Sequence, residues 1–413
     1  MAAGNGFGGS GLSWGMKRRE LLGLGGVVLL ASCSSDSPAP VAAPGELLAV
    51  SMPEGTVVLD SGTARKVAAG ALLAGNRLVG FDPDGRVVVR NAADGSVVTA
   101  ASVRGNLRIA AAAPGAGLLA LVEGAAGGRS QTTIVVAGPT GERHRLTLPG
   151  FVEPEAFSSS GTELFVLDML PPEHPDRYRV RVLDLAGGQL RALNLPGENA
   201  GVKVLVPPGA EEEMRGEGRQ AVFDARRERL FTLYSHQPDH EHVRDLLNPG
   251  ARDGKPDVHA FVHTLSVKDG WAVCVDLPSS FGTGEVPGLT IAQSADEVWV
   301  VDAGKGLAAV IHADALAVTH EIAVPAVAGA AASAAGGGRL YLAAGRKVTV
   351  LDVGAKEVAS SWALPADALG IAVSSGHLYV GQPEAVLRLD PLTGATTGRV
   401  AIPGLKGLHG VVG

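Results

Sequence analysis

Residues 370–403 read GIAVSSGHLYVGQPEAVLRLDPLTGATTGRVAIP, in which short apolar stretches alternate with Gly, Asp and Pro. Leu378 and Val380 show the every-second-residue pattern that is typical of a strand with one buried face. A third stretch ends at Asp390, and a Thr-Gly turn and a last stretch lead to Pro403. The pattern predicts four short strands, at residues 369–374, 377–381, 385–390 and 398–402.

The same arrangement recurs upstream, about 40 residues apart. Val350-Leu351-Asp352 leads to Pro365, and Val310-Ile311-His312 leads to Pro325. This period is typical of propeller blades. Because a four-stranded blade cannot bury its apolar surfaces alone, the repeat predicts a closed ring of antiparallel blades, an all-β propeller. We assign complete repeats to residues 71–103, 109–149, 152–196, 219–278, 287–325, 329–365 and 369–403.

The two ends of the chain complement each other. Residues 46–68 have the pattern of the second, third and fourth strands of a blade, and Leu408–Val412 has the pattern of a first strand. Joined, they form an eighth blade and remove an exposed sheet edge. Seven blades are the alternative, if residues 46–68 and 71–103 form one irregular unit. In either case residues 46–413 are a single domain.

Residues 370–380 and 389–394 resemble the YVTN-type repeat of YncE-like propellers. The resemblance is clearest in the last three repeats and extends over most of residues 46–413. It implies a fold rather than a function, because one such fold hosts many roles. The Asp that ends the third strand is expected to cap a tight turn, and the following Gly supplies the positive φ that the turn needs.

The N-terminal segment has the layout of an export signal. Lys17-Arg18-Arg19 precedes an apolar run at residues 21–30 that is too short to span a membrane. Leu30-Ala31-Ser32-Cys33 resembles the lipobox of a bacterial lipoprotein signal, which implies that Cys33 carries diacylglycerol. We therefore expect residues 1–32 to be a signal segment. Residues 33–45 would be a lipidated tether at the outer face of the cytoplasmic membrane.

Two further features concern export. Arg18-Arg19 followed by apolar Leu21-Leu22 resembles a twin-arginine signal, and general secretion is the alternative. Residues 1–15 are uncharged and rich in Gly, so we expect Met16 to be the true start.

Charge and cysteine content limit the function classes. The chain has a formal net charge of −7, and residues 1–32 contribute three positive charges and one negative charge, which leaves −9. An acidic domain of this kind argues against nucleic acid as a partner. Besides Cys33 only Cys274 is present, so no disulfide within the domain is expected. We expect a monomer that is stabilised by burial of apolar side chains.

Three long insertions interrupt the repeat. Residues 169–178 and 236–258 lie between the second and third strands of neighbouring blades, and residues 196–220 connect those two blades. In an up-and-down propeller these connections emerge on one face, so the insertions should lie together. Loops of this length in a compact domain are usually functional or disordered. We call this surface the insertion face.

Histidine is concentrated in these insertions. His236, His240 and His242 lie near acidic residues, and His174 belongs to the adjacent blade. Imidazole and carboxylate together suit Zn²⁺ or a similar divalent ion. In an extended segment His240 and His242 point the same way about 6.6 Å apart, which suits a shared ion. The alternative is a solvated polar loop without a ligand.

The sequence favours a tethered binding module over an enzyme. Residues 46–413 contain no Gly-x-Ser-x-Gly elbow, no His-Glu-x-x-His motif and no phosphate-binding Gly loop. We expect the insertion face to bind a protein or small molecule. A metal-binding propeller or metallochaperone is the first alternative, and a lactonase- or lyase-like enzyme at the channel mouth is the second.

Overall fold

The computed structural model describes residues 45–412, apart from 125–126, 198–202, 208, 216–218, 238–239, 249, 251–256 and 375. The expected signal segment 1–32 and Cys33 lie outside the described residues. No helix in the described part of the chain is long and apolar enough to cross a membrane.

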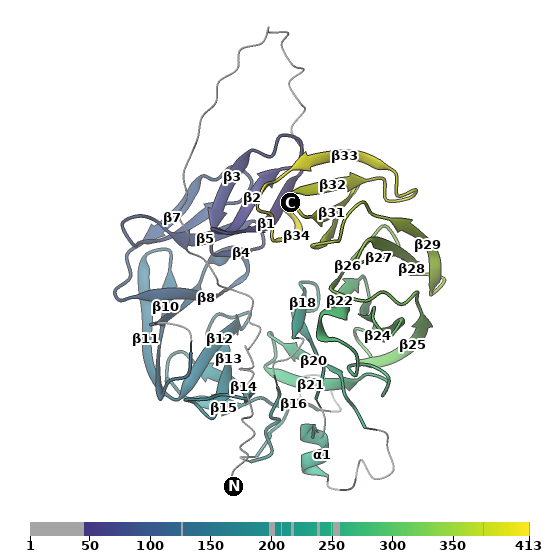
Figure 1. The fold of residues 1–413 in the computed structure, drawn as a ribbon. Coiled ribbons are helices and arrows are strands. Elements are labelled where there is room, and N and C mark those ends of the chain that lie inside the picture. Colours follow the sequence, from purple (N-terminus) through teal and green to yellow (C-terminus); the bar gives the residue numbers. More distant parts are fainter. Residues whose placement is uncertain are drawn as a thin grey trace, which may run out of the picture.

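Eight four-stranded antiparallel sheets form a ring (Figure 1). The first three complete blades contain, in order, β4 (Leu72–Ala74), β5 (Arg77–Phe81), β6 (Val87–Asn91), β7 (Val97–Ala101); β8 (Leu107–Ala112), β9 (Leu119–Glu123), β10 (Gln131–Gly138), β11 (Gly141–Pro149); and β12 (Phe151–Phe157), β13 (Glu163–Leu170), β14 (Arg177–Asp184), β15 (Leu190–Ala192). Blades 4 and 5 contain β18 (Gln220–Asp224), β19 (Arg229–Tyr234), β20 (Phe261–Ser266), β21 (Trp271–Asp276); and β22 (Leu289–Ser294), β23 (Glu297–Asp302), β24 (Leu307–His312), β25 (Ala317–Ala323). Blades 6 and 7 contain β26 (Ala331–Gly336), β27 (Arg339–Ala344), β28 (Lys347–Asp352), β29 (Glu357–Ala363); and β30 (Ile371–Val373), β31 (Leu378–Gln382), β32 (Ala385–Leu389), β33 (Thr396–Ala401).

The eighth blade joins the two ends of the chain. It consists of β34 (Gly407–Val412), β1 (Leu47–Met52), β2 (Gly55–Asp60) and β3 (Lys66–Gly70), paired in that order. Leu48 pairs with Val411, and Val50 pairs with Leu408. The eight-blade prediction and the closure by both ends are therefore confirmed, and the seven-blade alternative is wrong.

Short elements lie in the connections between the blade strands. They are the strand pair β16 (Leu195–Pro196) and β17 (Lys203–Val204), the helix α1 (Val243–Leu247), and the 3-10 turns η1 (Pro114–Ala116) and η2 (Val286–Gly288). Of these, β16, β17 and α1 belong to the insertions at residues 196–220 and 236–258.

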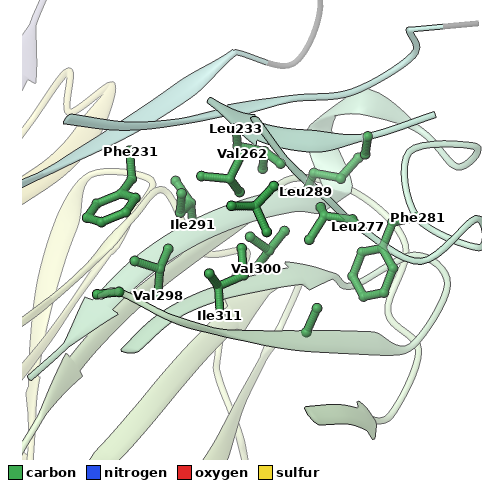
Figure 2. Close-up of a cluster of buried hydrophobic side chains, with 14 residues drawn as sticks. Phe231, Leu233, Val262, Leu277, Phe281, Leu289, Ile291, Val298, Val300 and Ile311 are labelled. Atoms are coloured by element: carbon green, nitrogen blue, oxygen red, sulfur yellow. The ribbon is translucent and has the colours of Figure 1, made fainter. Parts of the chain in front are cut away.

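Apolar side chains between adjacent blades form the core. Figure 2 shows one such layer, in which side chains of β19 and β20 in blade 4 face those of β22, β23 and β24 in blade 5. Phe231, Leu233 and Val262 meet Leu289 and Val300, and all five are fully buried. Each blade thus buries its apolar faces against its two neighbours, as the repeat requires.

The predicted turn chemistry is present. The Asp390 carboxylate accepts hydrogen bonds from the backbone N–H groups of Leu392 and Thr393 at 2.9 and 2.8 Å, and Gly394 follows with a φ of 73°. Asp60 accepts the equivalent bonds in the closing blade from Gly62 and Thr63, both at 2.9 Å. These caps fix where the third strand ends.

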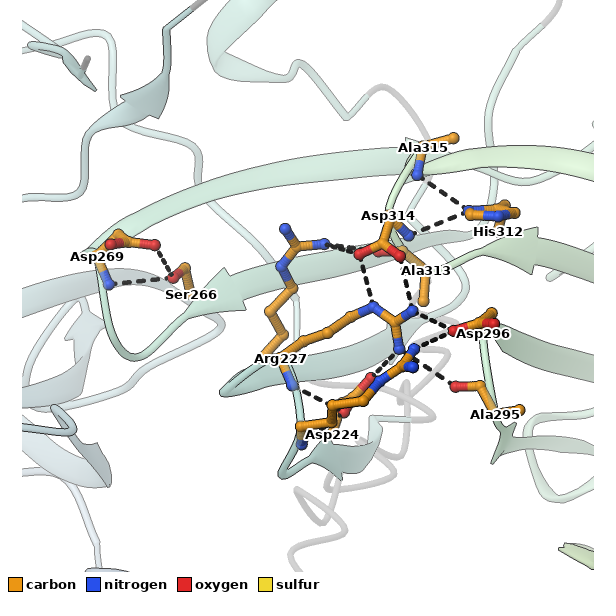
Figure 3. A network of polar contacts seen from close by, with 12 residues as sticks. Asp224, Arg227, Ser266, Asp269, Ala295, Asp296, His312, Ala313, Asp314 and Ala315 are labelled. Atoms are coloured by element: carbon orange, nitrogen blue, oxygen red, sulfur yellow. Dashed lines mark hydrogen bonds and ion pairs between the residues drawn. The ribbon is translucent and has the colours of Figure 1, made fainter. Parts of the chain in front are cut away.

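An ionic network links blades 4 and 5 on the face opposite the insertions (Figure 3). Arg227 lies in the β18–β19 turn, and its guanidinium contacts Asp224 at 2.7 Å, Asp296 at 2.5 Å and Asp314 at 2.7 Å. Asp296 and Asp314 belong to turns of blade 5. One buried cation therefore holds three carboxylates from two blades together.

The three insertions lie together on one face, as expected, but the first is shorter than predicted. Met169 and Leu170 extend β13, and Arg177 and Tyr178 extend β14, which leaves residues 171–176 as the loop. The strands lengthen because Tyr178 also pairs with Met214 of the 196–220 insertion and so gains backbone hydrogen bonds on a further side.

Candidate metal centre

The 196–220 insertion returns across blade 3 and places Glu212 beside blade 4. Backbone hydrogen bonds in both directions join Met214 to Tyr178 of β14, at 2.9 and 2.8 Å. The side chains on either side of Glu212 are held by blade 3 in ion pairs, Arg181 with Glu211 at 3.0 Å and Arg179 with Glu213 at 2.5 Å. Glu212 is thereby directed away from blade 3, and one of its oxygens accepts the Val243 N–H at 2.8 Å.

His240 and His242 come from the 236–258 insertion and pack on Phe261 of β20. The His240 ring stacks on Phe261 with centroids 4.4 Å apart, and the His242 ring meets Phe261 edge-on at 4.9 Å. The two imidazoles are 4.7 Å apart. His242 is also the N-cap of α1, where its backbone N–H donates to Asp245 at 3.2 Å. The apolar wall and the cap together orient both rings.

Asp276, which is itself paired with Arg244, contacts the His242 ring nitrogen that faces away from Glu212. Asp276 Oδ1 lies 2.6 Å from His242 Nε2, and its other oxygen pairs with Arg244 at 2.5 Å. This leaves His242 Nδ1 facing Glu212, at 3.3 Å from Oε1. A carboxylate that binds the far nitrogen of an imidazole is the usual support of a metal-ligating histidine.

His263 and Cys274 lie directly opposite each other across β20 and β21. Both side chains are buried, with 4% of each residue exposed. The Cys274 thiol donates to Glu212 Oε2 at 3.1 Å. A small cavity between blades 3 and 4 is lined by Glu212 and His263 on one side and by Val180 and Ala192 on the other.

Glu212 thus connects two groups of metal-ligand type. In one, single ligand atoms of Glu212, His240 and His242 all lie within 4.8 Å of one another, and in the other the same holds for Glu212, His263 and Cys274. Nitrogen, thiolate sulfur and carboxylate oxygen are the donors that zinc takes in proteins. The described side chains therefore present five such donors in one buried place.

The pKa shifts of Glu212 and His263 suit ligation, whereas a metal ion at His242 has to displace a proton. Burial alone would raise the pKa of Glu212, but the hydrogen bond and charge of His242 lower it to about 2. Burial would lower the pKa of His242, yet Asp276 and Glu212 hold it above its ordinary value. Burial also lowers the pKa of His263 to about 4, so this imidazole is neutral at neutral pH.

The Cys274 thiol differs from these groups. Burial and the neighbouring Glu212 carboxylate raise its pKa well above the ordinary value, so it is protonated at neutral pH. A bound cation would reverse that preference, because coordination deprotonates a thiol.

The structure brings together only part of the predicted set. His240 and His242 meet, as expected. His236 lies apart from them, with Nε2 2.6 Å from the Gly284 carbonyl oxygen and Nδ1 3.0 Å from Ser235 Oγ. His174 is exposed on the 171–176 loop. Neither belongs to a group of converging ligand atoms among the described residues.

Sequence reasoning missed Glu212, His263 and Cys274 as members of the site. For the last two a signal existed, because the Asp269-Gly270 turn joins β20 and β21. Counting outward from that turn pairs Ser266 with Trp271 and then His263 with Cys274. Glu212 had no comparable signal, since its position depends on how a long insertion folds over blade 3.

No protein-family model and no curated protein sequence matches this chain. Solved structures of similar fold include apo AztD from Citrobacter koseri, with 13% identity, coverage of 89% of this chain and 98% of that chain, and a TM-score of 0.48. The computationally designed Ika8 protein has 14% identity, covers 86% and 90%, and has a TM-score of 0.46. BamB from Moraxella catarrhalis has 9% identity, covers 83% and 97%, and has a TM-score of 0.41. These likenesses stop at the fold, so the function of this chain has to follow from its own side chains.

Proposed function

We propose that this protein binds a divalent transition-metal ion of the zinc type on its insertion face, with Glu212 as the shared ligand. The observation that supports it most strongly is the convergence of His240, His242, His263 and Cys274 on that one carboxylate. An enzyme site at the channel mouth and a metal site that includes His174 are less well supported. Among the described residues, His240, His242 and His263 converge around Glu212 instead.

Burial makes a purely structural role for this cluster costly. His242 and Cys274 are almost fully buried, and Glu212 is mostly buried beside them. Taking a carboxylate out of water costs several kcal/mol, on the order of 5, and is offset only by excellent partners. In the structure the Glu212 carboxylate is partnered by the Val243 N–H, the Cys274 thiol and His242. Glu212, the three imidazoles and the thiol are also all good ligands for a cation of the zinc type.

Replacing the shared ligand tests the proposal. We expect Glu212→Gln, which keeps the shape and the acceptor for the Val243 N–H, to weaken Zn²⁺ binding by about 100-fold or more. Loss of even an outer-shell partner costs about 10–100-fold, and a charged ligand should cost at least as much. Titration calorimetry with Zn²⁺ measures the affinity, and a zinc-dependent rise in melting temperature provides a second readout.

His320→Ala is the matched control, because His320 is an exposed imidazole on β25 in blade 5. It should bind Zn²⁺ as the wild type does. A wild-type dissociation constant weaker than about 100 µM, or equal affinities for wild type and Glu212→Gln, would refute the metal site. Far-UV circular dichroism of the apo variant shows whether it retains the strand content of the ring.

We further propose that the propeller acts outside the cytoplasm, tethered through a lipid on Cys33. The support is the lipobox-like Leu30-Ala31-Ser32-Cys33 and the Ser/Pro/Ala-rich stretch that follows it. A Cys33→Ala variant should lack diacylglycerol and leave the membrane fraction, which metabolic lipid labelling and fractionation measure. Wild-type protein that is soluble, unlipidated and begins at a residue other than Cys33 would contradict the tether.

A further inference from the structure

The two oxygens of Glu212 face different ligand groups. Oε1 is 3.3 Å from His242 Nδ1, on the side of the 236–258 insertion. Oε2 is 3.1 Å from Cys274 Sγ, on the side of the sheet. Among the described residues, Glu212 is therefore the one ligand common to an outer position, with His240 and His242, and an inner position, with His263 and Cys274.

The two positions differ in rigidity. His263 and Cys274 are paired residues in the ladder of β20 and β21, so the ladder hydrogen bonds hold them in place. His240 and His242 lie on a connection between β19 and β20, ahead of the five-residue helix α1. Ligands on loops are positioned less rigidly than ligands on paired strands. The inner ligands are thus held by a strand ladder, whereas the outer ligands lie on a connection between strands.

Charge favours one ion at a time. Two dications would bring four positive charges, and the Arg244 guanidinium beside Asp276 adds a fifth. Glu212, a Cys274 thiolate, Asp276 and Asp245, which lies 3.9 Å from Arg244, supply four negative charges. The remaining excess of one positive charge in a buried site would be unfavourable. A single dication at the inner position is neutralised by Glu212 and the thiolate together, with neutral His263 as the third ligand.

Donor chemistry favours the inner position as the final one. Thiolate is a softer ligand than imidazole or carboxylate and selects ions such as Zn²⁺ and Cu(I) over harder ones. The inner position also borders the small cavity between blades 3 and 4, which leaves space for a further ligand such as water.

Resting on the proposed function, we propose that this site is a two-position metal relay with Glu212 as its pivot. The ion first binds His240, His242 and Glu212 and then moves to Glu212, His263 and Cys274. The bonds to the two outer imidazoles break, bonds to His263 nitrogen and Cys274 sulfur form, and the thiol proton leaves to solvent. The metal keeps its oxidation state throughout.

Rapid mixing with Co²⁺ tests the relay, since cobalt reports its ligands by absorption. The protein is the full chain with Cys33→Ser, so that Cys274 is the one remaining thiol. We expect a fast phase with weak ligand-field bands, followed by a slower phase in which a sulfur-to-cobalt charge-transfer band appears. Cys274→Ser, a change of one atom, should abolish the second phase and keep the first.

The His240→Ala, His242→Ala double variant removes the two outer imidazoles and should change the rate of loading rather than the final state. It should reach the same final charge-transfer band, but the band should form about tenfold or more slowly because the entry ligands are missing. His320→Ala should show both phases at the wild-type rates.

The possible results of these experiments distinguish failure of the relay from failure of the proposed metal site. Failure of the wild type to bind Co²⁺ or Zn²⁺ would refute the proposed function. Binding without a sulfur band, or a double variant that loads at the wild-type rate, would refute the relay and leave a metal site of another arrangement.

Discussion

Deleting residues 405–413 should destabilise the whole propeller, because it removes the innermost strand of the closing blade. β34 pairs with β1 along its length, and Leu405 and Leu408 are buried in the apolar cluster between the closing blade and blade 7. Loss of these two side chains alone costs about 3–6 kcal/mol, and the unpaired edge of β1 adds to it. The free energy of unfolding in urea and the melting temperature should both fall clearly.

Gly410→Ala on the same strand is the matched control. A Cβ at this position meets no atom within 4 Å, and the residue has no positive φ, so its stability should match the wild type. If the truncated protein keeps the wild-type melting temperature, β34 does not close the ring.

Arg227→Met should destabilise the protein by about 3 kcal/mol, because it leaves carboxylates unpaired between blades 4 and 5. Breaking a buried ion pair costs about 3–5 kcal/mol. We expect the lower end, since Asp296 and Asp314 are more than half exposed, whereas the Asp224 side chain is only 3% exposed. Urea unfolding at neutral pH measures this difference.

Arg226→Ala is the control for that substitution. Arg226 is the next residue and also pairs with Asp296, but 64% of its side chain is exposed. Exposed pairs contribute about 0–1 kcal/mol, so this variant should stay within that range. Equal losses for the two variants would contradict the network in Figure 3.

The same network predicts a pH dependence. Hydrogen bonds from Arg227 lower the pKa of Asp314 from 3.8 to about 2 in the folded protein. In acid the unfolded chain takes up a proton before the folded chain does, so the stabilisation is full above about pH 4 and is lost as the pH falls towards 2. The stability difference between wild type and Arg227→Met should therefore shrink over that range. A difference that is constant with pH would show that Arg227 acts through packing alone.

The fold could be predicted from the sequence because each repeat carries its own strand and turn signals. Leu378 and Val380 lie on a strand as predicted, although Tyr379 between them is buried too, so β31 is buried on both faces. The Asp390 cap ends its strand as predicted. The closing blade followed from two incomplete patterns at the ends of the chain. Both inferences use sequence patterns that are local or that recur at a fixed period.

The candidate site could be predicted only in part. His240 and His242 are two residues apart, and alternate side chains of an extended segment point the same way. This was enough to predict that the two imidazoles meet. Glu212 reaches them through ion pairs with blade 3 that no local pattern reveals. The length of the first insertion was overestimated for the same reason, because the pairing of Tyr178 with Met214 is a long-range contact. Non-local polar contacts thus decide where the ligands meet.

The central claim is that one metal ion binds at Glu212. An anomalous difference map, calculated from crystals of the zinc-loaded protein measured at the zinc absorption edge, tests this most directly. We predict a single strong peak about 2.0–2.2 Å from a Glu212 carboxylate oxygen, with either Cys274 and His263 or His240 and His242 as the other protein ligands. No peak, or a strong peak only at other residues such as His174 or His236, would contradict the account.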